Sequence, residues 1–93
     1  MINVRYETRF KKQYKKMIAR GYDENDIRKV IHYLLSNEKL PFTYFDHKLN
    51  DSKKYKNVRE CHINPDWLLI YKIDYKNNEL ILIATGTHSD LFK

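Results

Sequence analysis

Three histidines and an aspartate are the side chains in this sequence that could move protons. His62 and Asp66 flank a turn at Asn64–Pro65, and an apolar run follows directly. His47 and His88 lie in segments with the composition of connections or strand ends. Histidine suits general acid–base catalysis because its unperturbed pKa, about 6.5, lies near neutral pH. If the fold brings the four side chains together, they form a cluster that could cleave RNA.

RNA cleavage without a metal requires a base for the 2′-hydroxyl, an acid for the 5′-oxygen and cations for the phosphate. Histidines can fill the first two roles, and an adjacent aspartate can orient a histidine. The 18 Lys and Arg residues can supply the cations. The chain therefore contains the residue types that this reaction needs.

Two other chemistries would use some of the same residues. Three histidines and an aspartate could bind zinc, but no pair has close ligand spacing and the surroundings are rich in lysine. Cys61 could be a nucleophile, but it alternates with His62 in an expected strand, so it should point to the opposite face and lie in the core. His32 lies beside the apolar stripe of an expected helix and should be structural. We therefore expect no metal and no cofactor.

Positive charge is concentrated near the N-terminus. The chain has 93 residues and a formal net charge of +6. Residues 1–22 contain seven Lys or Arg and one acid, whereas the charges in the remainder balance. Such a segment is either a solvated helix face or a surface for phosphates or an acidic protein. The candidate RNA-binding residues are Arg9, Lys12, Lys16, Arg20, Lys53, Lys54, Lys56 and Arg59.

Hydrophobic periodicity predicts the elements that must position these residues. Residues 2–7 alternate between apolar and polar, which predicts a strand. Thr8 is expected to cap a helix that has one apolar face and ends at Gly21. Asp23 is expected to cap a second amphipathic helix. Residues 36–56 are expected to form a long connection with one mobile end.

Three further strands are predicted, at residues 57–63, 67–75 and 79–85. Asn77–Asn78 suits a tight turn, and the short connections make these strands an antiparallel meander that the first strand should join. The predicted fold is α+β, with element order β-α-α-β-β-β and both helices on one face of a twisted antiparallel sheet. We expect a single domain spanning residues 1–93.

Length and hydropathy indicate a cytoplasmic protein. The longest apolar runs have five residues each, far fewer than the roughly 20 that a membrane-spanning helix needs. Residues 1–20 lack the apolar core of a secretory signal. One cysteine allows no internal disulfide. We therefore expect no membrane association.

Three sequence blocks resemble a known family. They are Asp46-His47-x-Leu49, the segment from Arg59 to Tyr71 (R-E-C-H-I-N-P-D-W-L-L-I-Y), and the segment from Thr85 to Phe92 (T-G-T-H-S-D-L-F). In this order they resemble the YafQ branch of the RelE/ParE toxin superfamily, the ribosome-dependent mRNA interferases of type II toxin–antitoxin modules. The resemblance covers nearly the whole chain.

The resemblance implies a compact α+β fold, an endoribonuclease and a site. The activity it implies is cleavage of mRNA in the ribosomal A site by attack of the 2′-hydroxyl on the adjacent phosphate. His47 would be the general base and His88 the general acid. His62 and Asp66 would hold the phosphate or tune those two histidines, and Phe92 would position a base. A DinJ- or RelB-like antitoxin with an acidic toxin-binding segment is the implied partner, in a hetero-oligomer, together with the ribosome and mRNA.

The chain departs from the family pattern in two places. Ala84 occupies a position where the family often has an arginine, so the transition-state charge must be met elsewhere, for example by Arg59 or a loop lysine. The segment between Leu49 and Arg59 lacks the usual glycine and tryptophan, and Tyr55 is the candidate replacement for the tryptophan.

Two rival functions remain open at this point. ParE-like toxins share the fold and inhibit DNA gyrase, but they lack the histidine cluster, so the three histidines argue against that function. A non-catalytic ribosome- or RNA-binding module is the other rival, and Ala84 is the feature that suggests it.

Overall fold

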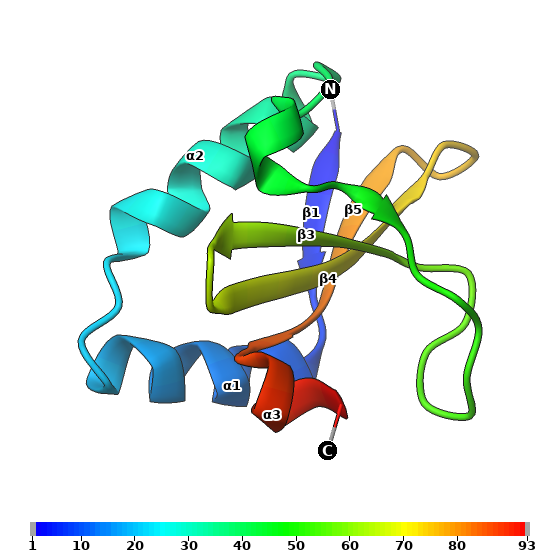
Figure 1. Ribbon diagram of the computed structural model, residues 1–93. Helices are drawn as coiled ribbons and strands as arrows, with labels where there is room; N and C mark the ends of the chain where they lie inside the picture. Colours follow the sequence, from blue (N-terminus) through cyan, green and yellow to red (C-terminus); the bar gives the residue numbers. More distant parts are fainter. Residues whose placement is uncertain (1, 93) are drawn as a thin grey trace.

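The computed structural model describes residues 2–92, which form a five-stranded sheet with helices on both of its faces (Figure 1). The strand order is β1-β5-β4-β3-β2. Along the chain the elements are β1 (Asn3–Tyr6), α1 (Thr8–Ala19), α2 (Glu24–Leu35), the 3₁₀ helix η1 (Phe42–Tyr44), β2 (His47–Lys48), β3 (Arg59–Asn64), β4 (Trp67–Asp74), β5 (Glu79–Gly86) and α3 (His88–Phe92). The predicted α+β class is confirmed, and β2, η1 and α3 are additions to the predicted order.

Strands β3, β4 and β5 form the predicted antiparallel meander. The first strand joins the same sheet, where it runs parallel to β5 at one edge. The expectation of an antiparallel sheet is therefore wrong for this one pair, because the strand pattern does not specify the direction in which an edge strand pairs. Strand β2 forms the other edge through two residue pairs with β3.

Helices α1 and α2 cover one face of the sheet. Buried Phe10 and Met17 of α1 and Val30 of α2 pack with Trp67 and Leu69 in one hydrophobic cluster. The side chain of Asp23 accepts a hydrogen bond from the backbone N–H of Asn25, which confirms the expected cap of α2.

The start of α1 differs from the prediction by one residue. Thr8 is the first helical residue, and Glu7 occupies the N-cap position without a side-chain hydrogen bond. Glu7 stays extended because its backbone N–H donates to the carbonyl of Leu82 in β5. The strand ladder therefore continues up to the helix. At the other end, Gly21 has a φ of +99° and follows the C-cap residue Arg20, so glycine suits the reversal that ends α1.

The second face of the sheet is covered by residues 49–58 and α3. Tyr55, Val58 and Leu91 are buried there in a second hydrophobic cluster. Backbone hydrogen bonds close the segment, one from Leu49 to Val58 and one from Ser52 to Tyr55. The expected mobile connection is therefore, in its second half, a covering layer held by Tyr55 and Val58.

Candidate active site

Two of the predicted histidines converge on a buried glutamate. Strand β2 pairs His47 with Glu60 of β3, and His62 lies two residues further along β3. The Nε2 atoms of His47 and His62 lie 3.6 and 3.8 Å from Oε1 of Glu60. The Glu60 side chain is 9% exposed, so a carboxylate lies in a largely dry position within ion-pair reach of both rings when they are protonated.

Glu60 was not among the residues selected from the sequence. A period of two along a strand places residues i and i+2 on one face, so Glu60 and His62 point the same way and Cys61 points the other way. Cys61 is fully buried in the cluster beneath the helices, and burial raises the pKa of its thiol. The expected core position of Cys61 is confirmed, and the same alternation was the signal that could have identified Glu60.

The orientation of His47 is fixed by its own backbone neighbourhood. Its Nδ1 lies 2.7 Å from the carbonyl oxygen of Phe45. A carbonyl only accepts hydrogen bonds, so Nδ1 carries the hydrogen, and in the neutral ring Nε2 carries the lone pair. Phe45 has a φ of +50°, which turns its carbonyl toward the ring. His47 thus presents a basic nitrogen on the side of Glu60.

Asp46 anchors this segment to the sheet. It accepts hydrogen bonds from Nε and Nη2 of Arg59 at 3.3 and 3.1 Å and from the hydroxyl of Tyr71. Burial and then the bond to Asp46 raise the pKa of Tyr71, so the phenol remains a donor. Arg59 was expected to contact RNA or to replace the missing arginine. The structure places it in this anchor with its side chain 44% exposed, and its contact with RNA stays a prediction.

The last block of the sequence builds a short helix that carries His88 and Phe92. Thr87 precedes α3, and its hydroxyl accepts from the N–H of Asp90 at 3.2 Å while Asp90 accepts from the N–H of Thr87 at 2.9 Å. This reciprocal pair is a capping box. Arg20 donates to both carboxylate oxygens of Asp90, at 2.7 and 3.3 Å, and this bond is the main cause that holds the pKa of Asp90 well below its usual range.

Gly86 and Thr85 explain the rest of that block. A Cβ at Gly86 would lie 2.9 Å from Cβ of Asp90, so glycine allows the helix to fold back. The hydroxyl of Thr85 accepts from Nε1 of Trp67 and donates to the carbonyl of Leu68, each at 2.7 Å. These two buried hydrogen bonds fix the position of Thr85 near the end of β5, and they thereby fix the point at which α3 begins.

The sheet register relates the two histidine groups. His47, Glu60, Ile70 and Ala84 form one row across four strands. His62, Leu68 and Gly86 form the next row, so the Cα atoms of His62 and Gly86 are separated by two strand spacings, about 10 Å. The His88 ring follows on α3 with its centroid 5.0 Å from that of Phe92. Both groups therefore lie on the face opposite α1 and α2.

Asp66 is held by a different neighbour. It lies in the turn between β3 and β4, and its carboxylate accepts a hydrogen bond from the hydroxyl of Tyr22 at 2.8 Å. This bond is the main cause that raises the pKa of Tyr22, whose ring packs on Trp67. The contact that fixes Asp66 is thus with the loop between the helices, not with the histidines. His32, which was expected to be structural beside the apolar stripe, is exposed on α2.

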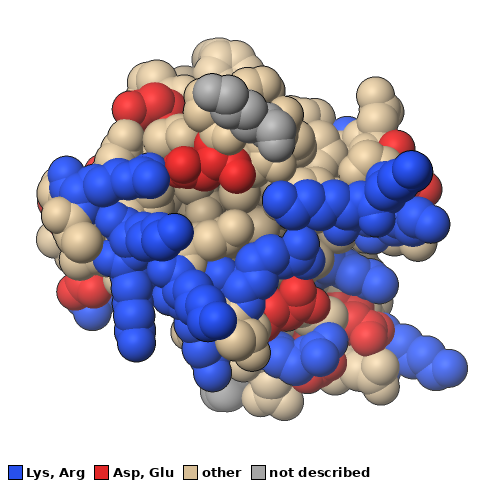
Figure 2. Space-filling view, turned by 90° about the horizontal axis from the view of Figure 1, so that it is seen from below, with Lys and Arg blue, Asp and Glu red and all other residues tan. Residues whose placement is uncertain are grey.

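The predicted basic residues fall into two groups. Arg20 and Arg59 form the ion pairs with Asp90 and Asp46 described above. Arg9 lies 3.4 Å from Glu7 and also over the ring of Tyr55, where Lys54 joins it. Figure 2, viewed from the side of α1 and α3, shows that Lys and Arg predominate over Asp and Glu on this face. The second group comprises Lys12, Lys16, Lys53, Lys54 and Lys56, which are exposed, as are the ion-paired Arg20 and Arg59.

Comparison with known proteins decides the family. The model of the YafQ family, described as the bacterial toxin of a type II toxin–antitoxin system, matches residues 2–93. The chain belongs to the YafQ toxin family. It is 37% identical over 91 residues to the mRNA interferase toxin YafQ of Escherichia coli BL21-DE3, covering 97% of this chain and 95% of that protein. The family resemblance seen in the three sequence blocks is confirmed.

Solved structures of similar proteins agree with this fold. YafQ in the E. coli DinJ–YafQ complex superposes with a TM-score of 0.89 at 35% identity, covering 100% of both chains. A metal-bound toxin from Helicobacter pylori superposes with a TM-score of 0.89 at 36% identity, covering 99% of this chain and 100% of that one. Within residues 2–92 of this YafQ-family chain, no three His, Cys, Asp or Glu side chains are grouped to hold a metal ion. No helix in the same range is long and apolar enough to cross a bilayer.

Proposed function

We propose that this chain, an mRNA interferase by its family membership, cuts mRNA in the ribosomal A site by metal-independent acid–base catalysis. The observation that carries the proposal is the convergence of His47 and His62 on Glu60, on the same sheet face as α3 with His88 and Phe92. His47 on β2 lies three strand spacings, about 14 Å, from β5, which leads into His88, so the proposed base and acid face each other across a gap that an RNA phosphate would fill.

In this mechanism Nε2 of His47 takes the proton of the 2′-hydroxyl. The 2′-oxygen bonds to phosphorus, the bond to the 5′-oxygen breaks, and His88 gives its proton to that leaving oxygen. The products are a 2′,3′-cyclic phosphate, or its hydrolysis product, and a 5′-hydroxyl. Glu60 steadies the imidazolium that forms at His47, and His62 binds the phosphate. Phe92 stacks on a base. Asp66 lies in the turn after β3, where the hydroxyl of Tyr22 donates to it, and its charge tunes the histidines.

Mapping of mRNA 5′ ends by primer extension tests this proposal. We expect discrete in-frame cuts on translating ribosomes, no cuts on naked mRNA, and the same pattern from protein that was treated with EDTA and desalted before it was added to the ribosomes. Uncut mRNA with the protein bound to the ribosome would point to a non-catalytic module. Inhibition of gyrase in a supercoiling assay would favour the ParE-like alternative. Loss of cutting after EDTA treatment and desalting of the protein, restored by adding a transition metal, would favour a metal-dependent nuclease.

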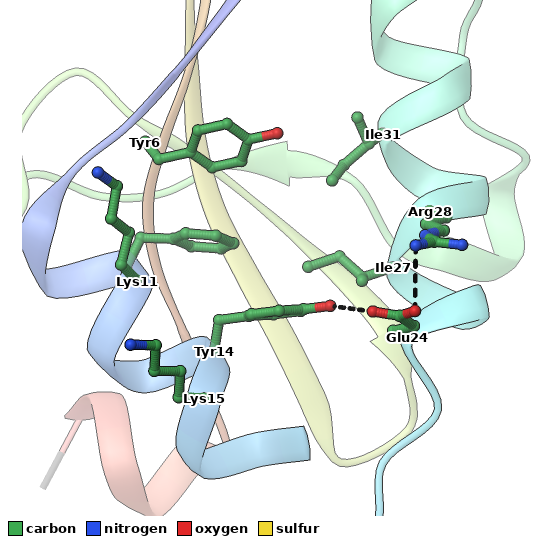
Figure 3. Close-up of a pocket in the computed structure, with 9 residues that line it drawn as sticks. Tyr6, Lys11, Tyr14, Lys15, Glu24, Ile27, Arg28 and Ile31 are labelled. Atoms are coloured by element: carbon green, nitrogen blue, oxygen red, sulfur yellow. Dashed lines mark hydrogen bonds and ion pairs between the residues drawn. The ribbon is translucent and has the colours of Figure 1, made fainter. Parts of the chain in front are cut away.

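We also propose a cytoplasmic complex with a small DinJ- or RelB-like antitoxin. The solved complex of a relative with DinJ supports this partner. A groove of about 480 Å³ opens between β1, α1 and α2, with Tyr6 and Ile31 on opposite walls and Lys11, Lys15 and Arg28 at its rim (Figure 3). Apolar walls with a mostly basic rim complement an amphipathic, acidic segment.

Substitution of an apolar residue in the wall of this groove is expected to prevent binding of the antitoxin. Ile31→Asp places a charge on the apolar wall and should abolish co-purification with the tagged cognate antitoxin. His32→Asp adds the same charge on the exposed side of α2 and should leave the complex intact. Equal retention of both variants by the antitoxin would place its binding segment elsewhere.

A further inference from the structure

A small basic groove lies on the second sheet face. Its volume is about 230 Å³, and five cations from four parts of the chain line it: Arg5, Arg9, Lys54, Lys56 and Lys72. Arg5 of β1 and Lys72 of β4 are both paired with Ile81 of β5, so they flank one apolar residue of the floor. Glu7 is the one acid among the lining residues, and it is paired with Arg9.

The side-chain hydroxyl of Tyr55, which lines the groove, is buried without a hydrogen-bond partner among the described residues. The residue as a whole is 3% exposed. The guanidinium of Arg9 and the ammonium of Lys54 lie 5.2 and 5.5 Å from the centre of its ring. A buried unpaired hydroxyl is unfavourable, so the site favours a ligand that brings an acceptor oxygen.

The groove also adjoins the candidate active site. The ring of Tyr55 packs edge-on against Phe92 at 6.0 Å, and Phe92 packs against His88 at 5.0 Å. A chain that stacks a base on Phe92 therefore has its backbone close to the cations around Tyr55. A free anion would contact only the cations, whereas a polynucleotide can contact the cations and Phe92 at the same time.

We propose that this groove binds a backbone phosphate of RNA next to the nucleotide being cut. The hydroxyl of Tyr55 donates to a phosphate oxygen, Arg9 and Lys54 turn from the ring to the same phosphate, and Lys72 contributes from the sheet. Charge-assisted bonds of this kind are stronger than neutral ones. The inference rests on the proposed function in taking RNA as the ligand, and it assigns a binding role to Tyr55 and Lys72 outside the histidine cluster, whereas Arg5 is paired with Glu79.

The test uses the intact protein and a single-stranded 2′-O-methyl RNA, which lacks the nucleophilic hydroxyl and reports binding alone. Lys72→Ala should weaken binding and reduce the slope of log K against log[salt] by about 0.7. Tyr55→Phe keeps the ring and should weaken binding by roughly 10-fold with no loss of folding stability. Lys29→Ala on the opposite face removes the same charge and should bind like the unsubstituted protein. Binding by Tyr55→Phe and Lys72→Ala equal to that of Lys29→Ala would overturn the proposal.

Binding to ribosomes with and without mRNA in the A site shows whether the phosphate belongs to mRNA or to ribosomal RNA. A defect of Lys72→Ala that appears only when mRNA occupies the A site assigns the phosphate to mRNA. A defect that also appears on empty ribosomes assigns the contact to ribosomal RNA and overturns the proposal, as does the absence of any defect. Because binding is measured separately from cutting, a wild-type protein that binds through the groove but leaves mRNA intact would refute the proposed cleavage alone.

Discussion

His88→Ala is expected to reduce the rate of mRNA cleavage on translating ribosomes by about 10²–10⁴-fold, the usual range for one general acid or base. The substitution removes the ring that would protonate the 5′-oxygen. It should leave the fold intact because His88 is exposed and alanine is a good helix former. Primer extension gives the rate, and thermal unfolding checks that the melting temperature is unchanged.

The pH dependence of the cleavage rate shows which histidine is the acid and which is the base. If His88 is the acid and His47 the base, the wild-type profile of kcat is bell-shaped, His88→Ala loses the alkaline limb and His47→Ala loses the acid limb. His32→Ala removes an exposed histidine on α2 and should match the wild type. Cleavage at the wild-type rate by His88→Ala would remove His88 from the mechanism.

Asp90→Ala is expected to lower cleavage by about 100-fold, although Asp90 would touch no RNA. Its carboxylate holds the N–H of Thr87 and both nitrogens of Arg20, and α3 has only five residues, too few to be stable alone. Without these bonds His88 and Phe92 lose their fixed positions, and a misplacement of about 1 Å can cost 10²-fold in rate.

A matched variant separates charge from capping. Asp90→Asn retains an oxygen for the N–H of Thr87 but loses the ion pair with Arg20, so its defect should be smaller than that of Asp90→Ala. Single-turnover cleavage and ribosome binding are measured for both, and the loss should fall mainly on cleavage. Wild-type cleavage by Asp90→Ala would show that α3 is positioned without this carboxylate.

The same carboxylate predicts a pH dependence. The pKa of Asp90 is lower in the folded state than the unfolded value of about 3.9. Its stabilisation of α3 is therefore complete above about pH 4 and is lost as the pH falls toward the depressed value. The amide resonance of Thr87 should report this release in acid, and Asp90→Asn should lack that transition.

Local periodicity was enough to predict most of the fold. Apolar spacing in α1 and α2 and the alternation in β3 to β5 follow from the side-chain directions of helix and strand, and these directions need no tertiary information. The alternation of Cys61 and His62 is an example, because it placed the cysteine in the core and the histidine on the other face. The three sequence blocks likewise identified the family.

Other elements depend on partners that are remote in sequence. Strand β2 has two residues and exists only because β3 offers a free edge, so His47 could not be aligned with Glu60 in advance. The segment 49–58 is rich in lysine, and its two buried residues, Tyr55 and Val58, reveal no period. Asp66 was expected beside His62, but the hydroxyl of Tyr22, 44 positions earlier, holds it.

The sequence by itself determined the α+β class, the helix-covered face, the candidate histidines and the family, because each depends on local patterns or on motif identity. Only the tertiary structure decided which groups lie together. It placed a buried Glu60 between two histidines, and it joined Arg20 to Asp90 across 70 positions to hold α3. The physical reason is that carboxylates and cations carry no periodic signal of their own, so their partners are selected by the packed sheet and helices that bring distant segments into contact.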